Sequence, residues 1–433
     1  MPRPARIVVA LFAVLLLGTT LAQELSFWSW RTEDVDAYDT FIDTFQQMEP
    51  GIDVEFEPYR NTEYNTIVST ALQGGGGPDI VHLRAYGGME PLAQAGHLVR
   101  LDDKIDALAE YDPGVLLGAT NRADGYVYGV PFALQTIQVL YNVAMFDELG
   151  LEEPQSWDAF IAVADALQAS GVNALANGTS DPWTVETLFG GIAPSYYGCT
   201  AFFEDVSSGA TDFTDPRFRA GLERMVAVEP YLAENHPGIG YTDMQTLFAF
   251  EQAGMLIGGS YELGVMADLN PELEIGAFPV PPASAGDETC ISFYVDGSYG
   301  VNANSDYPDA ALRFVEFLAS QEYGQMFTDE LQQISAVPGV QPTSEPLGEL
   351  AGMMNEMGTP YLMLTSFRFG QPSGSTLLQN EMQAVLGGDQ DLDTAIANIQ
   401  RGVAEWFDFD CAHDRARSVR GGRPPSPSRA GLA

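Results

Sequence analysis

The alternation of strand and helix patterns near the N-terminus constrains the fold of this chain more than any other feature. Apolar residues alternate with polar ones at 25–30 and again at 52–56, as they do in half-buried strands. Apolar residues recur at helical spacing over 35–48 and again over 64–72, and a third strand pattern follows at 80–83. This order predicts a parallel sheet with helices on both faces, which binds ligands at the carboxyl ends of its strands.

The same alternation resumes further along the chain. A strand pattern runs through 125–142, a helix begins at Ser156, and another helix is predicted from Pro308 to Ser320. Residues 23–410 form a body of about 390 residues, which is too long for one small hydrophobic core. We therefore expect two domains of the α/β class.

The first 22 residues have the composition of a secretory signal peptide. Arg3 and Arg6 precede an apolar run from Ile7 to Leu17, and small residues precede Gln23. A membrane anchor would need about 20 apolar residues to cross the hydrocarbon, which is more than this run supplies. The sequence therefore predicts a protein that is soluble after cleavage and is periplasmic or otherwise extracytoplasmic.

The charge of the chain excludes two classes of partner. The chain has 60 acidic and 19 basic residues, with a formal net charge of -41. Such a surface repels phosphate backbones and anionic lipids, so we expect neither nucleic acid nor a membrane surface as a partner.

Three cysteines leave an unpaired one whichever disulfide forms. We favour the pair Cys199 and Cys290, which export permits, because Cys411 lies in an atypical segment. That segment, 411–433, is rich in Arg, Gly, Pro and Ser, and we expect it to be disordered. It is either a docking arm or a stretch alien to the fold. The histidines and cysteines lack the spacing of zinc ligands, so neither a metal site nor a cofactor is predicted.

Several short segments, taken in their order and spacing behind the signal peptide, carry a resemblance to a known family. They are Gly77–Ile80, Leu92–Leu98, Tyr128–Phe132, Leu140–Asn142, Trp157–Phe160, Gly254–Tyr261 and the helix predicted after Asn302. With these segments the chain resembles the extracellular solute-binding proteins of family 1, the sugar-binding subunits of ABC importers. The resemblance implies a two-lobed α/β fold of the periplasmic-binding-protein kind, type II-like, with a ligand cleft between lobes that close over it.

The resemblance also implies where the chain passes between the lobes. Crossings are expected near Pro131, near Pro279–Pro282 and near Pro338. The N-terminal lobe would then comprise 23–131 plus about 283–337. The C-terminal lobe would comprise 132–282 plus about 338–410.

Sugar recognition needs flat aromatic rings for the apolar faces of a pyranose and directional polar groups for its hydroxyls. Asp181-Pro182-Trp183 resembles the family's acid-Pro-aromatic binding segment, and Gly259-Ser260-Tyr261 resembles its Gly-x-aromatic segment. The stacking candidates are Trp30, Trp183 and Tyr261. The remaining ligand-binding candidates are Arg31, Arg84, Tyr86, Gln135, Asp181, Asp296 and Arg368. The competing interpretation of any single arginine is that it neutralises surface carboxylates.

The predicted function is binding of a sugar or oligosaccharide and its delivery to the membrane subunits of an ABC importer, by a monomer that is not an enzyme. One alternative is a binding protein for a polyol, a uronic acid or another anionic solute, because three arginines that converge in one cleft would suit an anion. A second alternative is a secreted glycoside hydrolase, which would need two carboxylates roughly 5–10 Å apart.

Overall fold

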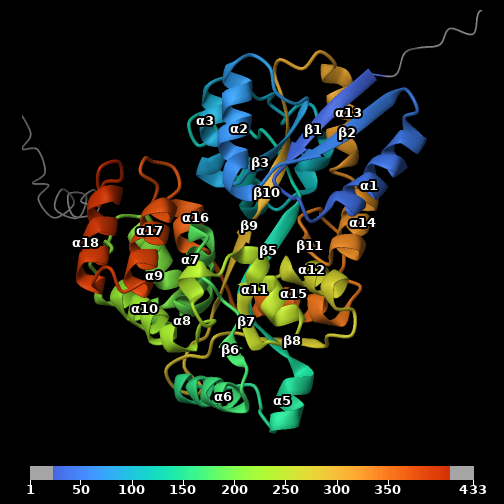
Figure 1. Cartoon of the computed structure of the whole chain (residues 1–433). Coiled ribbons are helices and arrows are strands. Elements are labelled where there is room, and N and C mark those ends of the chain that lie inside the picture. The colour runs from blue at the N-terminus through green and yellow to red at the C-terminus, as the bar shows by residue number, and fades with distance from the viewer. Residues whose placement is uncertain (1–22, 410–433) are drawn as a thin grey trace, which may run out of the picture.

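A computed structural model describes residues 23–409, which form two lobes, each built on one β-sheet (Figure 1). The predicted signal peptide, the segment 411–433 and Cys411 lie outside the described residues. Within residues 23–409, no helix combines the length and the apolar composition needed to cross a bilayer.

The first lobe contains a five-stranded sheet in the order β2-β1-β3-β10-β4. Strand β1 pairs in parallel with both β2 and β3, which confirms the parallel sheet predicted from the N-terminal pattern, while β10 is antiparallel to β3 and β4. Its strands are β1 (Gln23–Ser29), β2 (Ile52–Pro58), β3 (Ile80–Arg84), β4 (Val130–Pro131) and β10 (Gly297–Val301). Its helices are α1 (Val35–Met48), α2 (Asn61–Gln73), α3 (Glu90–Gln94), α4 (Pro113–Leu116), α13 (Pro308–Phe317) and α14 (Gln321–Leu331), with short 3-10 turns at Tyr86–Gly88, Asp106–Glu110 and Leu117–Ala119.

Amphipathic helices cover this first sheet because their apolar residues recur on one face. Helix α1 buries Tyr38, Phe41 and Phe45, and the ring of Phe27 from β1 packs edge-on against Tyr38 with 5.5 Å between centroids. These residues belong to one continuous hydrophobic core that also includes Phe314 of α13. The packed helices thus fix the strands whose carboxyl ends form one wall of the site.

The second lobe is built on a seven-stranded sheet centred on the long strand β5. Strand β5 is antiparallel to β7, β8, β9 and β11, and β6 and β12 extend the sheet in parallel. Its strands are β5 (Ala133–Asn142), β6 (Asn173–Leu175), β7 (Ala253–Gly259), β8 (Ile275–Phe278), β9 (Ile291–Val295), β11 (Ile334–Ser335) and β12 (Gly358–Pro360). Its helices are α5 (Val143–Leu149), α6 (Trp157–Ser170), α7 (Pro182–Ile192), α8 (Pro194–Tyr197), α9 (Cys199–Ser207), α10 (Pro216–Ala227), α11 (Tyr241–Ala249), α12 (Glu262–Leu269), α15 (Glu345–Met357), α16 (Leu362–Ser366), α17 (Gly374–Leu386) and α18 (Leu392–Val403), with 3-10 turns at Glu229–Tyr231 and His236–Gly238.

Two of the three predicted crossings lie where the sequence placed them. The chain leaves the first sheet at Pro131 and enters the second at Ala133, so Phe132 is the first crossing. Near Pro338 the chain reaches the second sheet at β11, returns to the core of the first lobe at Val337, and then packs against the second sheet at Leu347.

The crossing predicted near Pro279–Pro282 is wrong. Strand β8 before this segment and strand β9 after it both pair with β5, so the proline-rich segment stays within the second lobe. The change of sheet falls at Asp296, and residues 283–295 therefore lie outside the first lobe, contrary to the predicted start at about 283. Gly297 makes this switch possible, since a side chain there would collide with the rings of Trp30 and Phe132.

The crossings meet at the centre of the molecule, where β5 and β9 join the lobes (Figure 1). The amide of Asp296 donates a hydrogen bond to the carbonyl of Ala133 at 3.1 Å. The amide of Ala336 donates a hydrogen bond to the carbonyl of Phe132 at 2.9 Å. Hinges are formed by a few residues at the ends of regular elements, and Phe132 and Asp296 each lie between two strands in this way.

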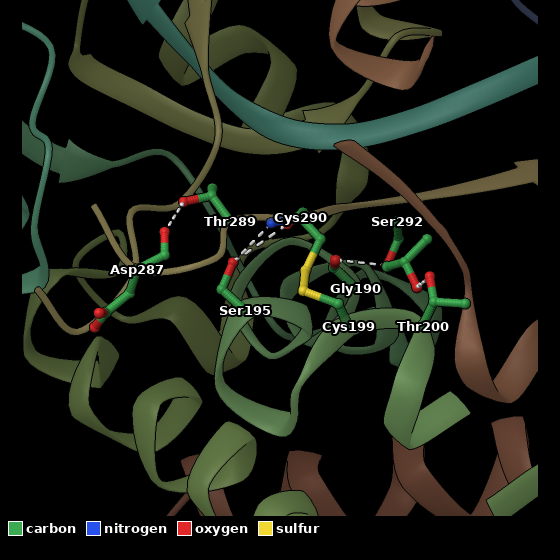
Figure 2. Close-up of a disulfide and its surroundings, with 9 residues drawn as sticks. Gly190, Ser195, Cys199, Thr200, Asp287, Thr289, Cys290 and Ser292 are labelled. Carbon is green, nitrogen blue, oxygen red and sulfur yellow. Dashed lines mark hydrogen bonds between the residues drawn. A yellow bond between two sulfur atoms is a disulfide. The ribbon is translucent and has the colours of Figure 1, made fainter. Parts of the chain in front are cut away.

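A disulfide joins Cys199 and Cys290, as predicted, and it lies within the second lobe (Figure 2). It ties the first residue of α9 to the segment that leads into β9, with 6.0 Å between the Cα atoms. Ser195 supports the same segment, because its hydroxyl accepts a hydrogen bond from the Cys290 amide at 3.1 Å.

Candidate functional site

A cleft of about 790 Å³ lies between the two lobes and is lined by residues of both. Its volume is in the range of small-molecule sites. One wall comes from the ends of β1 and β3 and from α2. The opposite wall comes from α7, α11, α16 and α17. The lining residues used below are Trp30, Arg31, Glu33, Asn61, Asn65, His82, Arg84, Trp183, Glu186, Tyr241, Tyr261, Tyr294, Asp296, Tyr361, Arg368, Ser375 and Gln379.

Seven of the ten predicted ligand-binding residues line this cleft. Trp30 and Arg31 follow β1 and Arg84 ends β3, so the carboxyl ends of neighbouring parallel strands meet the cleft as the sheet pattern predicted. The other four are Trp183, Tyr261, Asp296 and Arg368.

Three predicted residues do not line the cleft, but they form hydrogen bonds with residues next to it. Tyr86 is buried, and its hydroxyl accepts a hydrogen bond from the amide of Val295 at 3.1 Å. Gln135 is fully buried and takes part in hydrogen bonds with Ser260 and Gln333. Asp181 accepts a hydrogen bond from the Tyr241 amide at 2.8 Å and so positions a cleft aromatic residue.

Trp30 forms part of the floor of the cleft and has no ring face left for a sugar. The imidazole of His82 stacks on it with 4.0 Å between centroids, and Arg84 Cζ lies 3.8 Å from the ring centroid. Two groups this close to one ring must occupy opposite faces. The indole is only 2% exposed. We therefore assign Trp30 to the support of Arg84, because a guanidinium packs favourably over an aromatic face.

Arg31 is fixed by acidic neighbours. Its Nε lies 2.6 Å from Asp34 Oδ2, and its Nη1 lies 3.3 Å from Glu33 Oε1. Burial lowers the pKa of Arg31, but the charges of Asp34 and Glu33 outweigh this effect and raise the pKa well above its ordinary value. The charge of Arg31 is thus neutralised within the protein.

Among residues 23–409, Arg84 forms hydrogen bonds with neutral acceptors. Its Nη2 donates to Asn61 Oδ1 at 2.9 Å and its Nε donates to Asn65 Oδ1 at 3.2 Å, both from α2. Burial lowers the pKa of Arg84 to about 10, the charge of Asp296 opposes this, and the charge of Arg368 adds to it. The guanidinium remains charged at neutral pH.

Asp296 occupies the second crossing between the lobes and is surrounded by arginines. Burial raises the pKa of Asp296 above its ordinary value, and the charges of Arg31, Arg84 and Arg368 oppose this rise. In residues 23–409, none of these guanidinium groups forms an ion pair with Asp296 within 4.0 Å. A side-chain hydrogen bond with Gln135 also favours the charged carboxylate of Asp296, and so another predicted residue supports the cleft from behind.

The second lobe contributes a group of aromatic rings. Trp183 of α7 packs edge-on against Tyr241 with 4.6 Å between centroids and lies 6.5 Å from Tyr261. Tyr294 and Tyr361 form a second pair with centroids 5.4 Å apart. Trp183 and Tyr241 remain half-buried, so these rings offer faces to a bound molecule.

The sequence reasoning missed several polar residues of the cleft. Glu186 of α7 accepts hydrogen bonds from Ser375 Oγ at 2.8 Å and from Gln379 Nε2 at 2.6 Å, and these donors come from α17. No local motif links positions so far apart in the chain. Asn61 could have been found, because it begins the helix that follows β2 at the same edge of the sheet.

The chemistry of the cleft is that of reversible binding to a polar molecule with apolar faces. Rings, amides, guanidinium groups and carboxylates line it, and these groups suit hydroxyl recognition combined with stacking. Within residues 23–409, no group of three or more His, Cys, Asp or Glu side chains is arranged to hold a metal ion.

The fold and the cleft define a two-lobed binding protein of the α/β class. The chain belongs to the family of bacterial extracellular solute-binding proteins, whose family model matches residues 29–325.

Relatives of known sequence and structure support this assignment. The chain is 22% identical over 323 residues to the multiple sugar-binding protein of Streptococcus mutans serotype c. The aligned region covers 72% of this chain and 75% of that protein. The fold is similar to that of a chitin oligosaccharide binding protein (21% identity, TM-score 0.75, 88% of this chain and 98% of the other). It is also similar to that of the solute-binding protein RafE in complex with raffinose (22% identity, TM-score 0.73, 88% and 99%).

Proposed function

We propose that the protein binds a carbohydrate in the cleft and delivers it to the membrane subunits of an ABC importer. One observation carries this proposal: a single cleft of about 790 Å³ is lined on both sides. The second lobe contributes the aromatic wall, which contains Trp183 and Tyr241, and the first lobe contributes the polar wall, which contains Asn61 and Arg84. Trp183 and Tyr241 offer stacking faces, and the buried ring of Tyr261 packs behind them. Asn61, Asp296 and Arg368 offer directional partners for hydroxyls.

We expect the two lobes to close over the ligand by bending at the crossings between them. Both walls contribute to the cleft, so a ligand that contacts both is bound more tightly by the closed form than by the open one and shifts the population towards closure. We propose that the importer recognises this closed form. The proposal includes an extracytoplasmic, monomeric protein released by cleavage of the predicted signal peptide.

The alternative of a glycoside hydrolase makes a different use of the same cleft. Asp296 and Glu186 both line it, and a hydrolase needs a pair of carboxylates across the scissile bond. The hydrogen bonds from Ser375 and Gln379 engage both oxygens of Glu186, which fits a structural role in the wall better than proton transfer.

Isothermal titration against mono- and oligosaccharides, polyols and uronic acids tests the proposal. We expect one saturable site, and we expect the sugar to be recovered unaltered after prolonged incubation. Small-angle scattering should show compaction with the sugar that binds. Release of reducing ends would identify a hydrolase, and a folded protein that binds none of the carbohydrates would contradict the proposal.

A further inference from the structure

Two guanidinium groups face the cleft without an ionic partner of their own. Arg84 comes from the end of β3 in the first lobe, and Arg368 follows α16 in the second. The guanidinium of Arg84 donates hydrogen bonds to the side-chain oxygens of Asn61 and Asn65 in α2. In the described part of the chain, the guanidinium of Arg368 has no hydrogen-bond or ion-pair partner. Their positive charges are therefore directed to the cleft.

The backbone holds these two arginines close to each other. Gly87, three residues after Arg84, packs so tightly against the carbonyl of Arg368 that a Cβ at this position would collide with it. The neighbouring amide of Phe369 lies in the same contact. The approach of two like charges is unfavourable, and the charge of Arg368 helps to lower the pKa of Arg84.

In residues 23–409, no acidic group of the cleft forms an ion pair with Arg84 or Arg368. Arg31 is matched by Asp34 and Glu33. Asp296 lies among all three arginines, but in the described residues it forms no ion pair within 4.0 Å with any of them, and the oxygens of Glu186 are engaged by Ser375 and Gln379. His82 adds no charge, because burial lowers its pKa well below the ordinary value.

An arginine without an ionic partner is unexpected in this chain. Acidic residues outnumber basic ones 60 to 19, so carboxylates are plentiful as partners for an arginine. Arg217 and Arg313 are paired in this way on the surface, at 2.8 Å and 3.2 Å from Asp215 and Glu49. The guanidinium of Arg368 has no hydrogen-bond partner in the described residues, so it is suited to a ligand carboxylate, which such a planar group binds through two parallel hydrogen bonds, while Arg84 adds its charge beside it.

We infer that the carbohydrate bound in this cleft carries a carboxylate, which Arg84 and Arg368 hold between the two lobes while the aromatic wall stacks on the sugar ring. The ligand class is thus an acidic sugar, a uronic acid or its short oligomers. This inference rests on the proposed function. The anion also supplies a reason for closure, because it relieves the repulsion between guanidinium groups of opposite lobes.

Titration with matched ligands tests the inference. The ligands are galacturonic and glucuronic acid and their dimers, the neutral methyl esters of the same compounds, and the corresponding galactose and glucose sugars. We expect at least one acid to bind about 10-fold or more tightly than its methyl ester, the factor expected when a charge-assisted hydrogen bond is lost. The affinity of the acid should fall as salt is added.

Variants locate the effect on the two arginines. Arg368→Gln and Arg84→Gln should each weaken binding of the acid by about 10-fold more than binding of its ester. Arg368→Lys, which keeps the charge, should retain part of the difference. Arg313→Gln, which removes an exposed arginine of α13 far from the cleft lining, is the matched control and should leave both affinities unchanged.

The possible failures are distinguishable. Equal binding of acid and ester, or tighter binding of a neutral sugar, would overturn the inference and leave the proposed function standing. A folded protein that binds no carbohydrate of either charge would overturn both. Equal loss for acid and ester in the Arg368→Gln and Arg84→Gln variants would show that the arginines recognise hydroxyls, which also overturns the inference.

Discussion

Arg122 of the first lobe lies against Phe369 of the second, with its Cζ 3.2 Å from the centroid of the phenyl ring. The same guanidinium donates from Nη2 to the carbonyl of Thr365 at 3.0 Å. The backbone amide of Arg122 is anchored in turn by Glu90 Oε1 at 2.8 Å. This contact joins the lobes beside the cleft without lining it.

Replacing Arg122 should therefore favour the open form. Loss of a cation-π contact and a hydrogen bond costs about 1–2 kcal/mol, so Arg122→Ala should accelerate ligand dissociation by about 5- to 30-fold. Stopped-flow measurement of the dissociation rate checks this. Arg100→Ala is the matched control, because Arg100 packs 3.0 Å over Tyr126 within one lobe. Equal acceleration in both variants would contradict a role in closure.

Trp183 should dominate stacking on the ligand. It is the half-buried ring at the centre of the aromatic wall, with Tyr241 at its edge. Trp183→Ala should weaken binding by about 10-fold or more, because a stacked ring contributes on the order of 1.5 kcal/mol. Trp183→Phe should retain most of the affinity. Calorimetric curves that do not change in the alanine variant would remove Trp183 from the site.

The placement of the site residues could be predicted wherever it follows from the ends of regular elements. Arg31 and Arg84 lie in the cleft because each follows a parallel strand, and the carboxyl ends of such strands share one edge. The role of Trp30 could not be predicted. Strand periodicity places His82 and Arg84 on one face of β3, but it does not show that both pack on the same indole.

The path of the chain through 279–297 shows a second limit of prediction from sequence. Prolines at 279, 281 and 282 predict an irregular connection but not its destination. The crossing lies instead at Asp296, where Gly297 allows the backbone to pass the rings of Trp30 and Phe132. This steric requirement involves residues far apart in the sequence, so no local pattern contains it.

The stability of the protein should depend on pH through Glu262. This carboxyl group is 1% exposed, and its Oε2 accepts hydrogen bonds from Gln245 Nε2 at 3.0 Å and from the Tyr241 hydroxyl at 3.2 Å. Burial raises the pKa of Glu262 from 4.5 to about 7. The folded state thus retains a proton that the unfolded state releases in this range, so its stability falls as the pH rises from 4.5 to 7.

Glu262→Gln removes this titration and keeps an oxygen that can accept both hydrogen bonds. The variant should match the parent protein near pH 4.5, where Glu262 is protonated in the fold. Above pH 7 it should be the more stable by roughly 3 kcal/mol, because the pKa rises by about 2.5 units and each unit corresponds to about 1.4 kcal/mol. Urea unfolding of both proteins from pH 4.5 to 8 measures the difference. A difference that does not vary with pH would contradict the prediction.

Removal of the disulfide should lower stability without altering the cleft. Cys199 and Cys290 are 91 residues apart in the sequence, and closing a loop of this length restricts the unfolded chain by about 3–5 kcal/mol. Both cysteines belong to the second lobe, so the bond does not span the hinge and should not affect closure. The double variant Cys199→Ala/Cys290→Ala should unfold at lower temperature and lower urea concentration, yet bind its ligand with unchanged affinity where it is folded. Cys411→Ala controls for the loss of a cysteine and should change neither property. Weaker binding by a fully folded double variant would show that the disulfide transmits strain to the aromatic wall through α8 and α7, and would refute its assignment as a local constraint.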